Sequence, residues 1–176
     1  MKKITLVFAI IILSLSGTSL FAGDGATAVV DAVVQANLSL TTVDSVNFGT
    51  LQPTSTPILN PIGSGHTDIF SGSTIGSFDL TGANGQTVVV TEGGPVTLGD
   101  GGSNTMTFTP NLIGFATDVQ ASGTPVGATV VLDGSAGTYF FWLGGDLGTL
   151  TNKPAGSYSS DASNGTGNWT LDVEYQ

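Results

Sequence analysis

Apolar and polar residues alternate with a period of two along residues 26–40, which predicts a β-strand. At about 3.3 Å per residue the run would extend roughly 50 Å, whereas a typical strand covers about 17 to 20 Å. We therefore expect this segment to bend, change sheets or leave the domain. Its mainly apolar face consists of Ala26, Ala28, Val30, Ala32, Val34, Ala36, Leu38 and Leu40.

A second alternating run lies near the C-terminus. Its apolar positions are separated by Thr170, Asp172 and Glu174, the pattern of a strand with one buried face. We interpret this segment as a strand at the edge of a sheet. The apolar positions are Trp169, Leu171, Val173 and Tyr175.

Between these two runs, short apolar stretches alternate with turns rich in Gly, Asn, Asp, Ser and Pro, and no amphipathic helical pattern occurs. The expected fold is an all-β sandwich of eight or nine strands. Residues 52–76 are predicted to form a long surface loop with a short strand near residues 67–70, and residues 93–95 and 99–104 to form hairpin connections. The other predicted strands are residues 45–51, 76–80, 86–91, 105–109, 113–120, 129–132, 139–143 and 169–175.

Residues 1–22 have the pattern of a secretory leader, with Lys2 and Lys3 before an apolar run from Ile4 to Leu15. We expect cleavage near Gly23, a single domain over residues 23–176, and an exported, extracellular or cell-surface protein. The leader's apolar core is short for a bilayer span, and we expect no membrane span after cleavage. The chain has no cysteine, so disulfides cannot stabilise the fold.

The charge is strongly negative. The chain has 13 acidic residues, and Lys153 is the only lysine or arginine after the leader. A surface of this sign repels nucleic acid, so we expect no nucleic-acid partner. Solubility outside the cell explains the charge more simply than a specific cation partner does.

Candidate chemistry is sparse. His66 has no Cys or Glu at ligand spacing, and Asp100 and Asn104 lack the spaced acids of a calcium loop. The aromatic run from Tyr139 to Trp142, with Trp169, suggests a sugar-stacking platform, but core packing explains it better, with the second apolar face of the run meeting a neighbouring subunit or a loop. We expect no enzyme activity, no catalytic or metal-binding residues and no cofactor.

Several short motifs, in order, carry a family resemblance: Asn47-Phe48-Gly49, Phe78 with Gly82, Gly144-Gly145 followed by Leu147, residues 155–158 (Ala-Gly-Ser-Tyr), and the Tyr175 ending. With these motifs the chain resembles an exported family of unknown function related to spore coat protein U and archaic chaperone-usher pilins. The resemblance implies an immunoglobulin-like Greek-key sandwich lacking its last strand. It also implies that a periplasmic chaperone, and then the N-terminal strand of the next subunit, fills the resulting groove, with an usher assisting assembly.

The residues allow this mechanism independently, because an incomplete sandwich exposes a sheet edge that an added strand can pair with. Little sequence lies between the expected cleavage site and the alternating run. Either Ala26, Ala28, Val30, Ala32 and Val34 are the donor strand themselves, or the domain is self-complete. The expected function is a structural subunit of a pilus-like surface fibre or a coat, assembled with copies of itself or related subunits. The alternative is a monomeric secreted glycan-binding or adhesin module.

Overall fold

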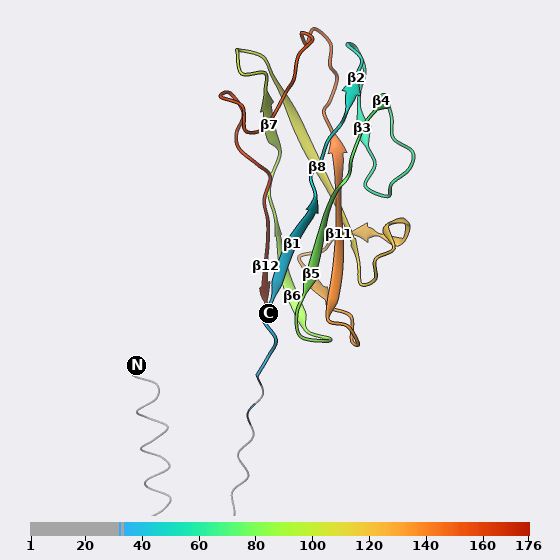
Figure 1. The fold of residues 1–176 in the computed structure, drawn as a ribbon, viewed down its shortest axis with the longest axis vertical. Helices are drawn as coiled ribbons and strands as arrows, with labels where there is room; N and C mark the ends of the chain where they lie inside the picture. Colours follow the sequence, from blue (N-terminus) through green and yellow to red (C-terminus); the bar gives the residue numbers. More distant parts are fainter. Residues whose placement is uncertain (1–31, 33) are drawn as a thin grey trace, which may run out of the picture. The chain divides into compact units, whose positions relative to one another are not determined.

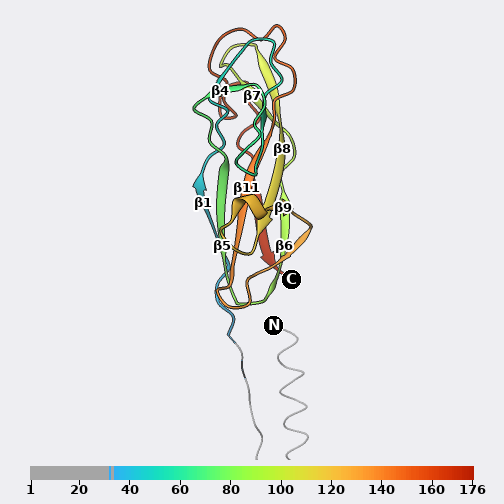
Figure 2. The ribbon, with the colours of Figure 1, turned by 90° about the vertical axis from the view of Figure 1, so that its right-hand side faces the viewer.

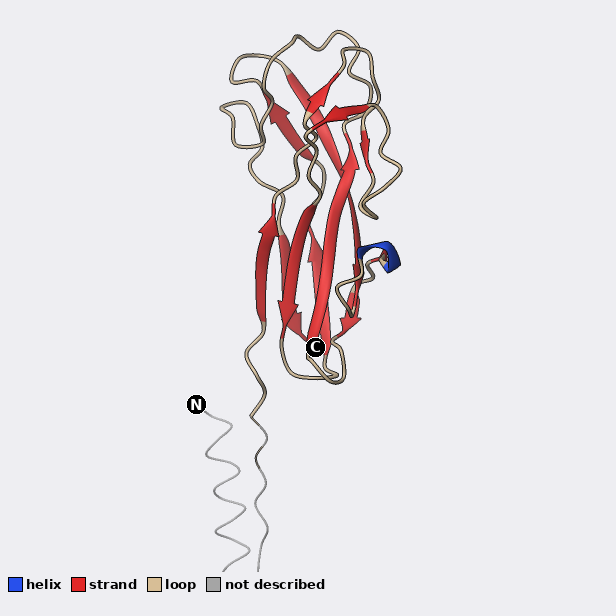
Figure 3. Ribbon diagram, turned by 45° about the vertical axis from the view of Figure 1, so that its right-hand side comes forward, coloured by secondary structure: helices blue, strands red, loops and turns tan. Residues whose placement is uncertain are grey.

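The computed structural model describes residue 32 and residues 34–176, of which Gln35–Gln176 form one compact unit. This unit is built from strands that follow its long axis, with one short 3₁₀ turn (Figure 3). The elements are β1 (Ser39–Asp44), β2 (Thr50–Leu51), β3 (Ile58–Leu59), β4 (Ile69–Ser71), β5 (Gly76–Thr81), β6 (Thr87–Glu92), β7 (Val96–Gly99), β8 (Thr105–Phe115), the 3₁₀ turn η1 (Gln120–Ser122), β9 (Thr124–Pro125), β10 (Thr129–Val131), β11 (Thr138–Asp146) and β12 (Leu171–Tyr175).

The strands form an all-β sandwich, as the sequence predicts. The larger sheet has the order β1-β5-β11-β8-β7, with β3 beside β11 and β9 beside β8. The smaller sheet has the order β10-β6-β12, and β2 pairs with β4. Figure 1 labels most of these strands, and the turned view of Figure 2 shows β1 and β5 on one side of the sandwich and β6 and the C-terminus on the other.

The core lies between these two sheets. Fully buried side chains include Leu80 of β5, Val88 of β6 and Phe141 of β11. The inward-facing residues of β12, which are Leu171, Val173 and Tyr175, pack against the same core while half-buried. β12 is an edge strand of the smaller sheet, and β1 is an edge strand of the larger one.

Two predicted strand boundaries are wrong. The first strand of the described chain is Ser39–Asp44, whereas residues 45–51 contribute only a bridge from Asn47 to Thr74 and the short β2. The reason is a turn in which the Asn47 side chain accepts a hydrogen bond from the Gly49 amide at 2.7 Å and Gly49 adopts a φ of 68°. Of the predicted strand over residues 26–40, residues 34–38 are described but not in a strand, and only Ser39 and Leu40 belong to β1.

The predicted break between residues 109 and 113 is also absent, because β8 runs unbroken from Thr105 to Phe115. Pro110 lies within β8 without breaking the strand. It is paired with Gly145 of β11 on one side, and on the other side it lies between the residues that pair with β7 and those that pair with β9. On this second side no strand of the described chain lies opposite Pro110, so the absence of its N–H removes no hydrogen bond between strands.

Residues 52–76 are not simply a surface loop. Pro57, Leu59 and Pro61 are almost fully buried, and β3 pairs with β11. The short strand expected near residues 67–70 is present as β4. Residues 93–95 do not form a hairpin either, since β6 belongs to the smaller sheet and β7 pairs with β8, so the chain changes sheets at this point.

Residues 99–104 do connect the antiparallel pair β7 and β8. Asp100 accepts hydrogen bonds from the Gly102 amide at 2.8 Å and the Asn104 side-chain amide at 2.6 Å, the second of which most strongly lowers the pKa of Asp100. Among the described residues no three His, Cys, Asp or Glu side chains gather where they could hold a metal ion. In residues 34–176, no helix has the length and apolar character that a membrane crossing requires.

Candidate functional site: a groove between two sheet edges

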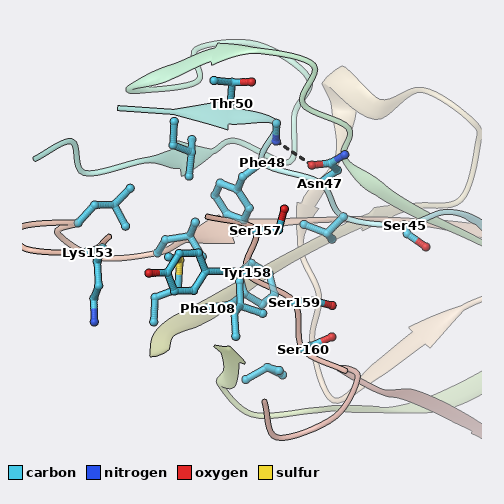
Figure 4. Close-up of a pocket in the computed structure, with 18 of the residues that line it drawn as sticks. Ser45, Asn47, Phe48, Thr50, Phe108, Lys153, Ser157, Tyr158, Ser159 and Ser160 are labelled. Carbon is cyan, nitrogen blue, oxygen red and sulfur yellow. Dashed lines mark hydrogen bonds between the residues drawn. The ribbon is translucent and has the colours of Figure 1, made fainter. Parts of the chain in front are cut away.

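A groove of about 890 Å³ lies between two chain segments, and we call it the edge groove. One wall runs from Thr42, near the end of β1, to Pro53. The other wall lies before β12, between Lys153 and Trp169. Figure 4 shows Phe48 of the first wall and Tyr158 of the second near Phe108. The groove therefore follows the side of the sandwich where the two sheets do not pair with each other.

The floor of the edge groove is apolar. It consists of core residues contributed by β7, β8, β11 and the chain that follows β11, so the groove opens onto the interior of the sandwich. Most of these side chains are already buried, including Phe108 at 5% exposure and Met106 at 8%. The floor side chains therefore expose little of their surface to the groove. The apolar floor residues are Val96, Leu98, Met106, Phe108, Leu143, Leu147 and Leu150.

Each wall presents unpaired backbone groups to the groove. Asn47 pairs with Thr74 on the side away from the groove, so the amide and carbonyl groups of its neighbours Val46 and Phe48 point the other way. Ser159 pairs likewise with Gly99, which turns the backbone of Tyr158 toward the groove. Within the described chain no hydrogen bond involves these groups of Val46, Phe48 or Tyr158. Unpaired backbone groups of this kind, with apolar side chains between them, are the groups that an added strand can pair with and cover.

Polar side chains of the walls are used in local structure. The Lys153 amine donates to the Thr105 carbonyl, the Ser159 hydroxyl donates to Asp161, and the Ser160 hydroxyl donates to Asn168. The groups that remain for contact with another molecule are therefore the apolar floor and the unpaired backbone amide and carbonyl groups of the walls. No nucleophile and base come together in these contacts.

The structure places the predicted site residues in three groups. Ala26, Ala28 and Val30 lie outside the described residues, while Ala32 and Val34 are exposed, Val34 at 93%. Trp169 lines the edge groove, and its indole nitrogen donates to the Gly93 carbonyl at 2.8 Å. Leu171, Val173 and Tyr175 lie in β12, beyond one end of the groove.

The aromatic run does not form an exposed platform. Phe141 is fully buried in the core, and Trp142 on the opposite face of β11 has 6% exposure within a single chain. Trp142 lies opposite the buried Ile113 of β8. The rings of Phe140 and Trp142 are stacked, with their centroids 6.4 Å apart. On the second apolar face of β11, Trp142 is therefore covered by the chain itself, whereas Phe140 is only half-buried.

The groove floor is not identified from the sequence, because residues 96–98, between the two predicted hairpin connections, are assigned to no strand. The alternation of Val96 and Leu98 was the available signal, although four residues are too few to distinguish a strand from a loop. Several motifs of the family resemblance do lie on the groove, namely Asn47, Phe48 and Gly49 on one wall and residues 155–158 on the other.

His66 lies away from the groove, where its Nδ1 atom accepts a hydrogen bond from the Asn60 amide at 3.0 Å. This contact gives the side chain a structural role within the segment that follows β3. His66 is exposed, as expected.

Comparison with known proteins identifies a family but no characterised relative. No curated protein and no solved structure matches the chain. Residues 38–175 match a family described as a domain of unknown function, DUF4402. The match covers β1 to β12 and hence both walls and the floor of the edge groove, and the chain belongs to the DUF4402 family.

Proposed function

We propose that this protein is a structural subunit of a pilus-like cell-surface fibre or a coat, assembled by β-strand donation. The N-terminal run containing Ala26, Ala28, Val30, Ala32 and Val34 of one copy enters the edge groove of another. The observation that carries the proposal is the pair of unpaired sheet edges flanking an apolar floor. A strand placed there would pair with both edges and complete the sandwich as an immunoglobulin-like fold.

The small side chains of the donor run suit the groove. Because the floor residues have little exposed surface left, the space above them accommodates alanine and valine better than phenylalanine or leucine. The lengths also agree. Nine donor residues span about 30 Å, and the first groove wall, from Thr42 to Pro53, is long enough for such a strand.

The ends of the sandwich favour a head-to-tail arrangement. The segment 35–38, at the base of the donor run, lies at the end where β12 finishes, whereas the groove extends toward the opposite end, where β2 lies (Figure 1). A contact between two different surfaces of the same protein generates an open-ended chain of copies. The match to the DUF4402 family begins at Leu38, after the whole donor run.

The partners in this proposal are copies of the chain or related subunits. The leader pattern and the family resemblance add a periplasmic chaperone that fills the groove before assembly, and an usher for export. An unpaired apolar groove is prone to aggregation, which is a physical reason for such protection. A monomeric glycan-binding module gains no support from the aromatic run, since Phe141 and Trp142 are buried.

The test is gel electrophoresis in detergent of material sheared from cells, with and without boiling. Strand-exchanged polymers resist detergent until heated, because dissociation removes a whole strand from its groove. We expect a heat-sensitive ladder for the wild type and its loss in the variant Val30→Asp with Val34→Asp, since both charges would face the groove floor.

The matched control carries the same substitutions one position earlier, Val29→Asp with Val33→Asp. In an extended strand these side chains point to the opposite face, so the ladder should persist. A single monomer band for the wild type, or an equal ladder in both double variants, would contradict strand donation.

A further inference from the structure

The hydroxyl of Tyr175 joins the two sheet edges below the edge groove. It donates a hydrogen bond to the Ala36 carbonyl at 2.9 Å and accepts one from the Ala83 amide at 2.6 Å. The side chain thus connects the end of β12 both to the residues that precede β1 and to the turn after β5. Gly82 permits the close approach, because a Cβ atom there would lie 2.5 Å from the hydroxyl.

The same end of the sandwich contains no continuation of the groove. Residues 38–41 and residues 171–175 do not line it, although they lie on the two edges that form its walls further along. Leu38, Leu40, Leu171 and Val173 are half-buried and pack against the core there. The gap between the edges is therefore filled by the chain's own side chains at this end.

Further contacts secure the base of the donor run. The Gln35 side chain donates a hydrogen bond to the Gln86 side chain at 3.3 Å. The Leu38 side chain packs close to Gly82, where a Cβ atom would lie 2.9 Å from it. To fill its own groove, the donor run would have to reverse direction between Gln35 and Leu38 and pass along β1. That reversal would compete with the bond from Tyr175 to Ala36.

We infer that Tyr175 is a positioning residue that closes one end of the edge groove and fixes the base of the donor run, so that the strand received comes from a second copy and enters at the open end. This inference rests on the proposed function. According to this inference, the hydrogen bonds of Tyr175 favour polymerisation over insertion of the donor run into the groove of its own chain. The segment from Trp169 to the end of β12 then has two roles, because Trp169 lines the groove and Tyr175 ends it.

The substitution Tyr175→Phe tests the inference, since it keeps the ring and removes both hydrogen bonds. In the full chain, we expect a weaker heat-sensitive ladder and more detergent-resistant monomer than in the wild type. Tyr139→Phe is the matched control: Tyr139 lies in β11, and its hydroxyl makes no hydrogen bond to the described residues. That control should give the wild-type ladder.

A second measurement distinguishes self-completion from misfolding. The probe is a fluorescent synthetic peptide with the sequence of residues 24–34. A tethered strand competes at millimolar effective concentration, so we expect the Tyr175→Phe monomer to bind this peptide at least about tenfold more weakly than the Val30→Asp with Val34→Asp protein. Adding those two substitutions to Tyr175→Phe should restore binding, because the protein's own strand can no longer insert.

The outcomes separate the two proposals. If Tyr175→Phe gives the wild-type ladder, the inference about Tyr175 is overturned and strand donation stands. If the triple variant does not bind the peptide while the double variant does, Tyr175 only maintains the fold and the inference is also overturned. If the wild type forms no ladder and the double variant binds no peptide, the proposed function itself fails.

Discussion

Single residues shape the first wall of the edge groove. Asn47 and Gly49 form a turn that separates the bridge from Asn47 to Thr74 from the pairing of β2 with β4, and Phe48 within it reaches the core at 8% exposure. The ring of Phe48 meets Phe108 edge to face at a centroid distance of 5.8 Å. The local sequence Asn-Phe-Gly thus places an aromatic side chain at the bottom of the groove.

Gly49→Ala should lower the free energy of unfolding by about 2 to 4 kcal/mol, because alanine disfavours the φ of 68° and its Cβ atom would overlap with the Ser71 carbonyl oxygen. Gly101→Ala is the control. Gly101 has a φ of 79° but no atom within 4 Å of the added methyl group, so only the conformational cost of about 1 kcal/mol should remain. Denaturant titration measures both variants, and equal losses would show that the clash is relieved by a small shift.

We expect Asp133 to make the stability of the fold depend on pH. Its carboxylate accepts hydrogen bonds from the Ser135 hydroxyl and from the Ser135 and Ala136 amides, which lower the pKa of Asp133, the Ser135 side chain most strongly. A lowered pKa in the folded state means that the stabilisation is fully present above the unfolded value of about 4 and is lost as the pH falls through the folded value.

We therefore expect Asp133→Asn to lower the urea midpoint at neutral pH and the difference from the wild type to shrink below about pH 4. Asp118→Asn is the control, because Asp118 is exposed and makes no hydrogen bond to the described residues. A difference for Asp133→Asn that persists unchanged in acid would show that the carboxylate charge is not the cause.

At the scale of the element, strands are set by their neighbours as much as by their own pattern. β5 and β6 alternate clearly and agree with their predicted bounds to within one residue. β3 is only two residues long and is preceded by Pro57, yet it pairs with β11 and buries Leu59 completely. A strand this short forms because an existing sheet offers it a partner.

Leu59→Ala should lower the free energy of unfolding by about 2 to 5 kcal/mol, the cost of a cavity in a closed core. The neighbouring Ile58→Ala should cost less than about 1 kcal/mol, since Ile58 is 41% exposed. Thermal or denaturant unfolding of the two variants provides the comparison. Similar small losses at both positions would mean that residues 57–61 do not contribute to the core.

At the scale of the whole molecule, the two sheets meet along one side without pairing. Because β1 belongs to the larger sheet and β12 to the smaller one, their free edges flank a gap that narrows to a closed end at Tyr175 and widens into the edge groove beyond it. The polymer test and the Tyr175→Phe test both examine this asymmetry. A groove open at both ends would admit the protein's own strand as readily as that of a second copy.

The sequence by itself determined the all-β class, the edge strand ending at Tyr175 and the central strands, because alternation along six or more residues depends only on one buried and one exposed face. It also indicated that residues 26–40 are too long for one strand. The tertiary structure alone decided that residues 57–61 enter the core, that β7 pairs with β8 and supplies the groove floor, and that the Tyr175 hydroxyl reaches Ala36. These features depend on contacts between residues far apart in sequence, which no local pattern encodes.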